Sequence, residues 1–72
     1  MESIYLDDYI YLAVKLKQAR IEAGLGHDDV ARLIDKSQSY ISKIEAGRLR
    51  LDLVQLNELA ELYKKSLDYF LR

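Results

Sequence analysis

The sequence contains no cysteine and no proline, and it has only three glycines in 72 residues. The lack of cysteine excludes disulfide scaffolds, thiolate metal sites and cysteine nucleophiles. The lack of proline and the few glycines favour helices over turn-rich β-folds. No apolar run approaches the ~18–20 residues that span a bilayer, so we expect no membrane segment. A chain of this length can fill one small core, which predicts a single domain.

Basic charge is concentrated in one segment of a chain whose formal net charge is −1. Residues 1–35 are acidic, and the first residues resemble neither a secretory signal nor a transit peptide, which predicts a cytoplasmic protein. Residues 36–50 hold four basic side chains against a single acidic one, Glu45. The four are Lys36, Lys43, Arg48 and Arg50. Such a segment either binds DNA as one face of the fold or is a solvated surface.

Apolar residues at steps of four, three and four predict a first helix over about residues 6–23. Gly24 suits the left-handed position that ends a helix. Residues 1–11, which are acidic and rich in tyrosine, form either an N-terminal arm or the start of this helix. The apolar stripe of the helix consists of Leu12, Leu16, Ala19 and Ala23.

Two short helices are expected on either side of a tight turn. The first covers about residues 27–34, and Asp35 suits the turn after it because aspartate tolerates a positive φ. The second covers about residues 38–46, with Ser37 as its N-cap. The residues that these two helices are expected to bury are Val30, Ala31, Ile34, Ile41 and Ile44.

Two further helical segments are expected after residue 51. Asp52 and Gln55 have the spacing of a capping box, which predicts a helix that ends near Tyr63. Ser66 is suited to cap a last helix of one or two turns. The apolar rows of these segments consist of Leu53, Leu56, Leu59, Ala60, Tyr63, Leu67, Phe70 and Leu71. The whole pattern predicts an all-α fold, a compact bundle of five short helices.

Three motifs carry a resemblance to a known family. The most specific is residues 37–47, Ser-Gln-Ser-Tyr-Ile-Ser-Lys-Ile-Glu-Ala-Gly, which a basic residue follows. Before it come Asp-Asp-Val-Ala at residues 28–31 and an arginine, Arg20, four residues ahead of Gly-Leu. Residues 12–72 are therefore similar to the helix-turn-helix DNA-binding domain of the Cro and phage-repressor type, also called the xenobiotic-response-element family. His27 stands where this family usually has a phosphate-touching glutamine, and residues 35–36 replace its usual glycine and apolar residue.

The resemblance implies that the helix at about residues 38–46 reads DNA. Glutamine can grip adenine, lysine can reach guanine, and serine donates to or accepts from several bases. The expected base-contacting residues are Gln38, Ser39, Ser42 and Lys43. The expected phosphate-contacting residues are His27, Lys36, Tyr40, Arg48 and Arg50. The alternatives are a polar helix face in water, a merely solvated Lys36, and a Tyr40 ring that packs on neighbouring helices.

Arg20 and Glu45 have a different expected role. The family resemblance implies that they form an ion pair that links the first helix to the third. A partly buried pair adds little net stability, but the loss of one partner leaves an unpaired charge. We therefore interpret both residues as structural and not as DNA contacts.

Catalytic and metal sites are not expected. His27 with Asp28 and Asp29 is poor material for a metal site, because adjacent helix positions point to different faces and no cysteine is present. No serine lies among the glycines of a nucleophile elbow, and so small a chain cannot enclose a pocket. We predict no enzyme activity, no cofactor and no small-molecule effector.

The leading hypothesis is a transcriptional regulator, in particular a repressor, that binds a palindromic operator in double-stranded DNA as a homodimer. The dimer contact would come from the fifth helix, the end of the fourth, or the tyrosine-rich N-terminal residues. Within the same fold, the protein could instead be an antitoxin with a toxin partner or the controller of a restriction–modification operon. A protein-interaction module that has lost DNA binding is the alternative from a different class.

Overall fold

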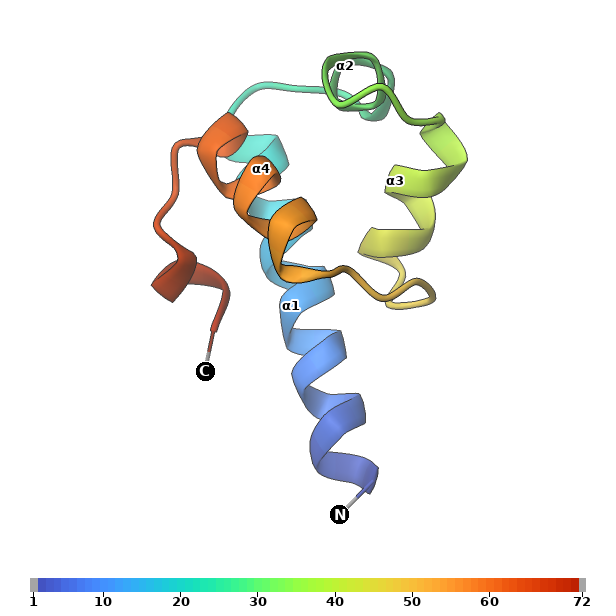
Figure 1. Cartoon of the computed structure of the whole chain (residues 1–72), viewed down its shortest axis with the longest axis vertical. Helices are drawn as coiled ribbons and strands as arrows, with labels where there is room; N and C mark the ends of the chain where they lie inside the picture. The colour runs from blue at the N-terminus through green and yellow to red at the C-terminus, as the bar shows by residue number, and fades with distance from the viewer. Residues whose placement is uncertain (1, 72) are drawn as a thin grey trace.

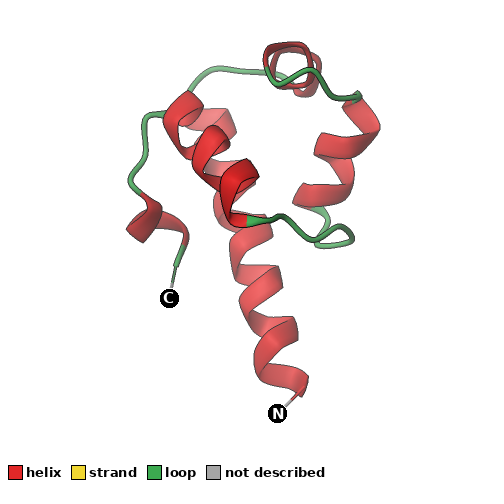
Figure 2. Ribbon diagram, viewed as in Figure 1, coloured by secondary structure: helices red, strands yellow, loops and turns green. Residues whose placement is uncertain are grey.

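The structure, a computed structural model, describes residues 2–71 (Figure 1). Within that range the chain forms four α-helices and one 3₁₀ helix, and no strand (Figure 2). In chain order they are α1 (Glu2–Glu22), α2 (His27–Leu33), α3 (Gln38–Glu45), α4 (Leu53–Tyr63) and the 3₁₀ helix η1 (Leu67–Phe70). The predicted all-α class is confirmed, whereas the prediction of five α-helices is wrong.

The expected fifth helix is a single 3₁₀ turn because the segment has few means to extend a helix. The side chain of Ser66 makes no capping hydrogen bond, and Leu71 already returns to extended backbone, at φ −104° and ψ 151°. Runs of 3₁₀ helix longer than three or four residues are uncommon, because their hydrogen-bond geometry is poorer than that of an α-helix. Phe70 anchors the turn to the core, since it is 2% exposed and lies edge-on to the ring of Tyr69.

Helix α1 is the central element of the fold (Figure 1). Helices α3 and α4 and the η1 turn pack against it, and α2 packs against α3. The largest fully buried side chains are Phe70, Leu16, Ile41, Leu59 and Val30. Each of them removes apolar surface from water, a gain of roughly 1.5–3 kcal/mol for a side chain of this size. None of the helices within residues 2–71 has the length and apolar composition of a membrane span.

Three residues assigned to the apolar rows lie outside the core. Ala23 is exposed because α1 ends at Glu22 and the chain turns away. Leu53 is 70% exposed because it lies in the first turn of α4, at the edge of the row that the later leucines form. Leu71 is 57% exposed because it follows the end of η1 in extended backbone.

A residue in the left-handed conformation follows each of the four α-helices. Gly24 has a φ of 76°, Asp35 a φ of 59° and Gly47 a φ of 73°. Lys64 also has a φ of 59° at the end of α4, a conformation that no glycine or asparagine at this position announces in the sequence. The backbone N–H groups of Lys64 and Lys65 donate to the carbonyls of Glu61 and Ala60 at 3.1 and 2.9 Å, which closes α4 with the hydrogen bonds of a Schellman motif.

The predicted capping box of α4 is only half formed. The Asp52 carboxylate accepts a hydrogen bond from the Gln55 backbone N–H at 2.7 Å. The Gln55 side chain does not return to the Asp52 backbone, because its amide donates to Glu58 at 2.8 Å and its oxygen accepts from Tyr40. The tertiary contact with α3 therefore replaces the reciprocal bond.

Helix α1 begins at Glu2, so residues 2–11 continue the helix without a break. A helix of 21 residues is about 31 Å long. In Figure 1 its N-terminal part extends past the other helices, towards the end marked N. This extension makes the molecule longest in one direction, with principal extents of 36 × 24 × 20 Å.

Candidate nucleic-acid interface

Helix α3 is capped at its start and anchored along one side. The Ser37 hydroxyl accepts a hydrogen bond from the Tyr40 backbone N–H at 3.1 Å, which satisfies one of the free donors of the first turn. Ile41 and Ile44, three residues apart on one side of the helix, are 2% and 3% exposed. The two isoleucines keep α3 from rolling about its own axis, so its opposite side is presented to solvent in a defined orientation.

That opposite side holds the four residues predicted to contact bases. Their side chains are exposed, and they make no hydrogen bond or ion pair with the rest of the chain from residue 2 to residue 71. The four are Gln38, Ser39, Ser42 and Lys43. The structure thus brings four exposed hydrogen-bonding side chains together on one side of a helix, and an α-helix is an element that the major groove admits.

The turn between α2 and α3 is tight and leads directly into this surface. Asp35 adopts the left-handed conformation, and the Lys36 backbone N–H donates to the Ala31 carbonyl at 2.8 Å. Together with a bond from Asp35 N–H to the Arg32 carbonyl, this is the hydrogen-bond pattern of a Schellman motif. Asp35 therefore supplies the positive φ that a glycine usually supplies in this turn of the family that the sequence resembles. The Lys36 side chain is exposed at the N-terminal end of α3.

Tyr40 lies between the predicted surface and the core. Its hydroxyl donates to the Gln55 oxygen at 3.3 Å, and the Lys36 ammonium lies 5.2 Å from the centre of its ring. Partial burial, together with the nearby carboxylates of Asp52 and Glu58, raises the pKa of the Tyr40 hydroxyl. The hydroxyl thus has a partner within the protein, and its contact with a phosphate stays a prediction.

The chain leaves α3 in a second left-handed turn. Gly47 supplies the positive φ, and the Arg48 backbone N–H donates to the Lys43 carbonyl at 2.9 Å. The Arg48 side chain is exposed just beyond the C-terminal end of α3. Arg50 is also exposed, and its guanidinium carbon lies 5.1 Å from the centre of the Tyr9 ring on α1. The sequence offers no signal for this cation–π contact, because Tyr9 and Arg50 are far apart in the chain and no motif connects them.

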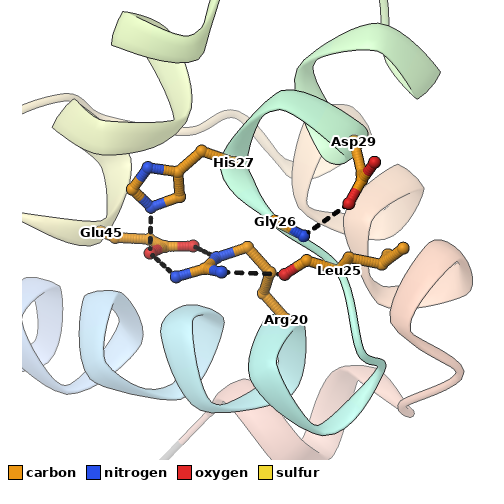
Figure 3. Close-up of polar contacts among 6 residues, drawn as sticks. All are labelled: Arg20, Leu25, Gly26, His27, Asp29 and Glu45. Atoms are coloured by element: carbon orange, nitrogen blue, oxygen red, sulfur yellow. Dashed lines mark hydrogen bonds and ion pairs between the residues drawn. The ribbon is translucent and has the colours of Figure 1, made fainter.

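Arg20 and Glu45 connect α1 to the C-terminal end of α3 (Figure 3). The Arg20 Nε atom donates to one Glu45 oxygen at 2.7 Å and an Nη atom donates to the other at 3.1 Å. A further Nη donates to the Leu25 carbonyl at 2.9 Å. The two side chains are only 11% and 6% exposed. Hydrogen bonding to Glu45 raises the pKa of the Arg20 guanidinium, which favours its charged form.

His27 joins the same cluster from the start of α2. Its Nε2 atom lies 3.1 Å from a Glu45 oxygen, as Figure 3 shows, and its side chain is 37% exposed. Glu45 therefore holds side chains from both α1 and α2. The Nε2 atom of His27 is engaged within the protein, and a phosphate contact by this side chain stays a prediction. Tyr63 lies close by on α4, where burial and the Glu45 charge raise the pKa of its hydroxyl.

Asp29 caps the start of α2 from within the helix. Its carboxylate accepts a hydrogen bond from the Gly26 backbone N–H at 2.8 Å (Figure 3) and another from Arg32 at 3.0 Å. The bond from Gly26, followed by that from Arg32, lowers the pKa of the Asp29 carboxyl. Negative charge at this position also suits the helix dipole. No group of three or more possible metal ligands gathers anywhere in the described part of the chain.

The helix-turn-helix domain family matches residues 12–68, and the chain belongs to this family. The match confirms the family resemblance noted in the sequence. No curated protein and no solved structure matches the chain. Membership indicates a DNA-binding regulator, and helix-turn-helix DNA-binding domains are typically not enzymes. In the order of the chain, α2, its turn and α3 make up the helix-turn-helix unit.

Proposed function

We propose that the protein is a sequence-specific transcriptional repressor that acts in the cytoplasm and binds a palindromic operator as a homodimer. The observation that carries this proposal is the outward side of α3. Its four polar side chains are exposed and make no hydrogen bond or ion pair with residues 2–71, while the other side of the helix is held by Ile41 and Ile44. A polar side chain without such a partner in the protein is available to a base edge.

Helix α3 has a size and polarity that suit the major groove. Its eight residues extend about 12 Å along the helix axis, enough to follow the groove over a few base pairs. Gln38 and Ser39, in its first turn, enter the groove first, and Lys43 follows about one turn later. Gln38 reads adenine and Lys43 reads guanine, since these are the pairings that their donors and acceptors favour.

Basic side chains at both ends of α3 hold the helix against the phosphates. Lys36 precedes the helix, and Arg48 and Arg50 follow it, all three with exposed side chains. Phosphate contacts set the position and angle of the helix but carry no sequence information. The outward side of α3 therefore reads the bases, and the basic side chains at the two ends of the helix provide affinity.

Dimerisation follows from the small size of the reading surface. One α3 contacts too few base pairs to select a single operator, and two copies related by a two-fold axis read two half-sites about 34 Å apart. Bound across a promoter, such a dimer excludes polymerase, which is repression. We propose that the amount of protein and not a small-molecule effector sets occupancy.

The experiment is selection of binding sites from a pool of random duplex DNA, followed by gel shifts with the enriched sequences and with DNA from upstream of the protein's own gene. The expected result is an inverted repeat with half-sites about one helical turn apart. A sequence without symmetry would overturn the palindrome. Equal, weak binding of every duplex would overturn sequence-specific regulation and favour the protein-interaction module.

A further inference from the structure

The two arginines that follow α3 differ in what holds their side chains. Arg48 is exposed and makes no hydrogen bond, ion pair or ring contact with the part of the chain that the structure describes. Arg50 is exposed too, but its guanidinium carbon lies 5.1 Å from the centre of the Tyr9 ring on α1. A guanidinium within about 6 Å of a ring centre is attracted to the face of the ring. The Tyr9 ring therefore supports the side chain of Arg50, and Arg48 has no such support within the described residues.

The backbone on either side of Arg50 is also held. Leu49 and Leu51 are partly buried, and both pack against the hydrophobic core. Arg50 lies between these two leucines and is exposed. An arginine with a fixed backbone and a ring under its guanidinium has fewer conformations to lose when it meets a phosphate. Arg50 is therefore ordered before DNA arrives.

The contact with Tyr9 leaves the hydrogen-bond donors of Arg50 available. A guanidinium is planar and has five N–H groups, which point outward from its edge, so a ring under its face competes with none of them. The Arg50 guanidinium donates no hydrogen bond to any described part of residues 2–71. A phosphate oxygen can therefore accept from Arg50 while the Tyr9 ring stays in place.

Tyr9 lies outside residues 12–68, the part of the chain that the helix-turn-helix family matches. It is half-buried on the N-terminal part of α1, which extends past the other helices in Figure 1. The family pattern gives this residue no role. The interaction that the structure gives its ring is the contact with Arg50, at one end of the candidate DNA interface.

We propose that Tyr9 is a positioning residue of the DNA interface, whose ring holds the Arg50 guanidinium ready for a phosphate. This proposal rests on the proposed function, in which Arg50 contacts the DNA backbone, and it gives the N-terminal part of α1 a role in binding. Order that exists before binding reduces the entropy lost on binding, so Tyr9 raises the affinity without contacting DNA. Because phosphate contacts carry no sequence information, the gain is the same for every duplex.

The test is a double-mutant cycle between Tyr9 and Arg50, measured as the affinity of the full chain for a mixed-sequence DNA duplex at low salt. We expect Tyr9→Leu to weaken binding by about two- to tenfold per bound copy, because one long side chain must then be ordered on binding. In the Arg50→Ala background, Tyr9→Leu should have no further effect. In the Arg48→Ala background, its effect should persist in full.

Two further variants separate the ring of Tyr9 from a general effect on α1. Tyr9→Phe keeps the ring and should bind DNA as the wild type does. Tyr11→Leu is the matched control, because Tyr11 lies on the same helix and the Lys15 ammonium lies 5.6 Å from the centre of its ring. It should leave the affinity for DNA unchanged. Melting curves check that each variant folds as the wild type does.

An equal loss from Tyr9→Leu with and without Arg50 would overturn the positioning role, because the ring would then act through the fold. Wild-type affinity of Tyr9→Leu would overturn it as well. In both cases the proposed function stands as long as Arg48→Ala and Arg50→Ala weaken binding. A wild-type protein that binds no duplex would overturn the proposed function and this proposal together.

Discussion

Helix α3, with eight residues, has an inner polar region, Glu45, and an outward polar region, Gln38, Ser39, Ser42 and Lys43. The two regions differ in whether their side chains have partners within the protein. Glu45, at its C-terminal end, is 6% exposed and is held by Arg20 and His27. The side chains of Gln38 and Lys43 are exposed and make no hydrogen bond or ion pair within residues 2–71. In the sequence, both regions consist of polar or charged residues on the same helix. A side chain's partners within the fold, and not its chemistry alone, therefore decide whether it supports the structure or is available to a ligand.

The largest expected effect is on stability, from the inner region. Glu45→Ala leaves the Arg20 guanidinium without its carboxylate in a site of low exposure, which should destabilise the fold by about 3–5 kcal/mol. In a domain of this size, that lowers the melting temperature by about 10 °C or more. Thermal melting followed by circular dichroism measures the change.

Two control variants sharpen this result. Glu45→Gln keeps one acceptor for Arg20 and should lose less stability than Glu45→Ala. Ser42→Ala changes the outward side of the same helix and should leave the melting temperature within about 2 °C. If Glu45→Ala melts at the wild-type temperature and loses affinity for DNA instead, then the contrast between the two regions is wrong.

The second largest expected effect is a loss of DNA sequence preference when side chains of the outward region are removed. Lys43→Ala and Gln38→Ala should each remove about 1–3 kcal/mol of discrimination at one base pair per half-site. Both variants should melt as the wild type does, because neither side chain contacts the core. Binding to a panel of single-base operator variants measures the preference. Equal losses on every variant, with no position relaxed, would show that α3 does not read sequence.

The third effect concerns the arginines that follow α3. Arg48→Ala and Arg50→Ala should weaken binding to all sequences alike, and each should reduce the slope of log K against log salt by about one. Titrations at several salt concentrations measure the slope. An unchanged slope in both variants would place these arginines away from the phosphates. Tyr9→Leu distinguishes the two arginines, because it removes the ring that Arg50 contacts and leaves Arg48 unaltered.

The smallest effect is the pH dependence at the start of α2. Hydrogen bonds from Gly26 and Arg32 lower the pKa of the Asp29 carboxyl, so its ionised form stabilises the folded state. This contribution is present above the usual pKa of 3.8 and is lost as the pH falls through the lowered value of the folded protein. Asp29→Asn keeps an acceptor oxygen but removes the charge, and should melt slightly below the wild type at about pH 7. The gap should narrow towards about pH 3, and a gap that widens on acidification would contradict the assignment.

Local signals in the sequence determined much of the helix-turn-helix unit. Ser37 acts as the expected N-cap because its hydroxyl needs only the backbone three residues on. Gly24, Asp35 and Gly47 turn the chain because their positive φ suits these residue types. Ile41 and Ile44 are buried because helical periodicity alone puts them on one side. Each of these features depends on residues within one or two turns of each other.

Contacts between residues far apart in the sequence became visible only in the tertiary structure. The periodicity and capping signals of the sequence do not predict the short 3₁₀ turn at Leu67–Phe70, the exposure of Leu53 or the left-handed Lys64. The engagement of His27 by Glu45 and the contact of Tyr9 with Arg50 join residues 18 and more than 40 positions apart. Periodicity and capping report only on neighbours along the chain, because hydrogen bonds and side-chain spacing within a helix extend over four residues. Which side chains meet across helices is set by the packing of the whole core, and so is the difference between a held polar residue and a free one.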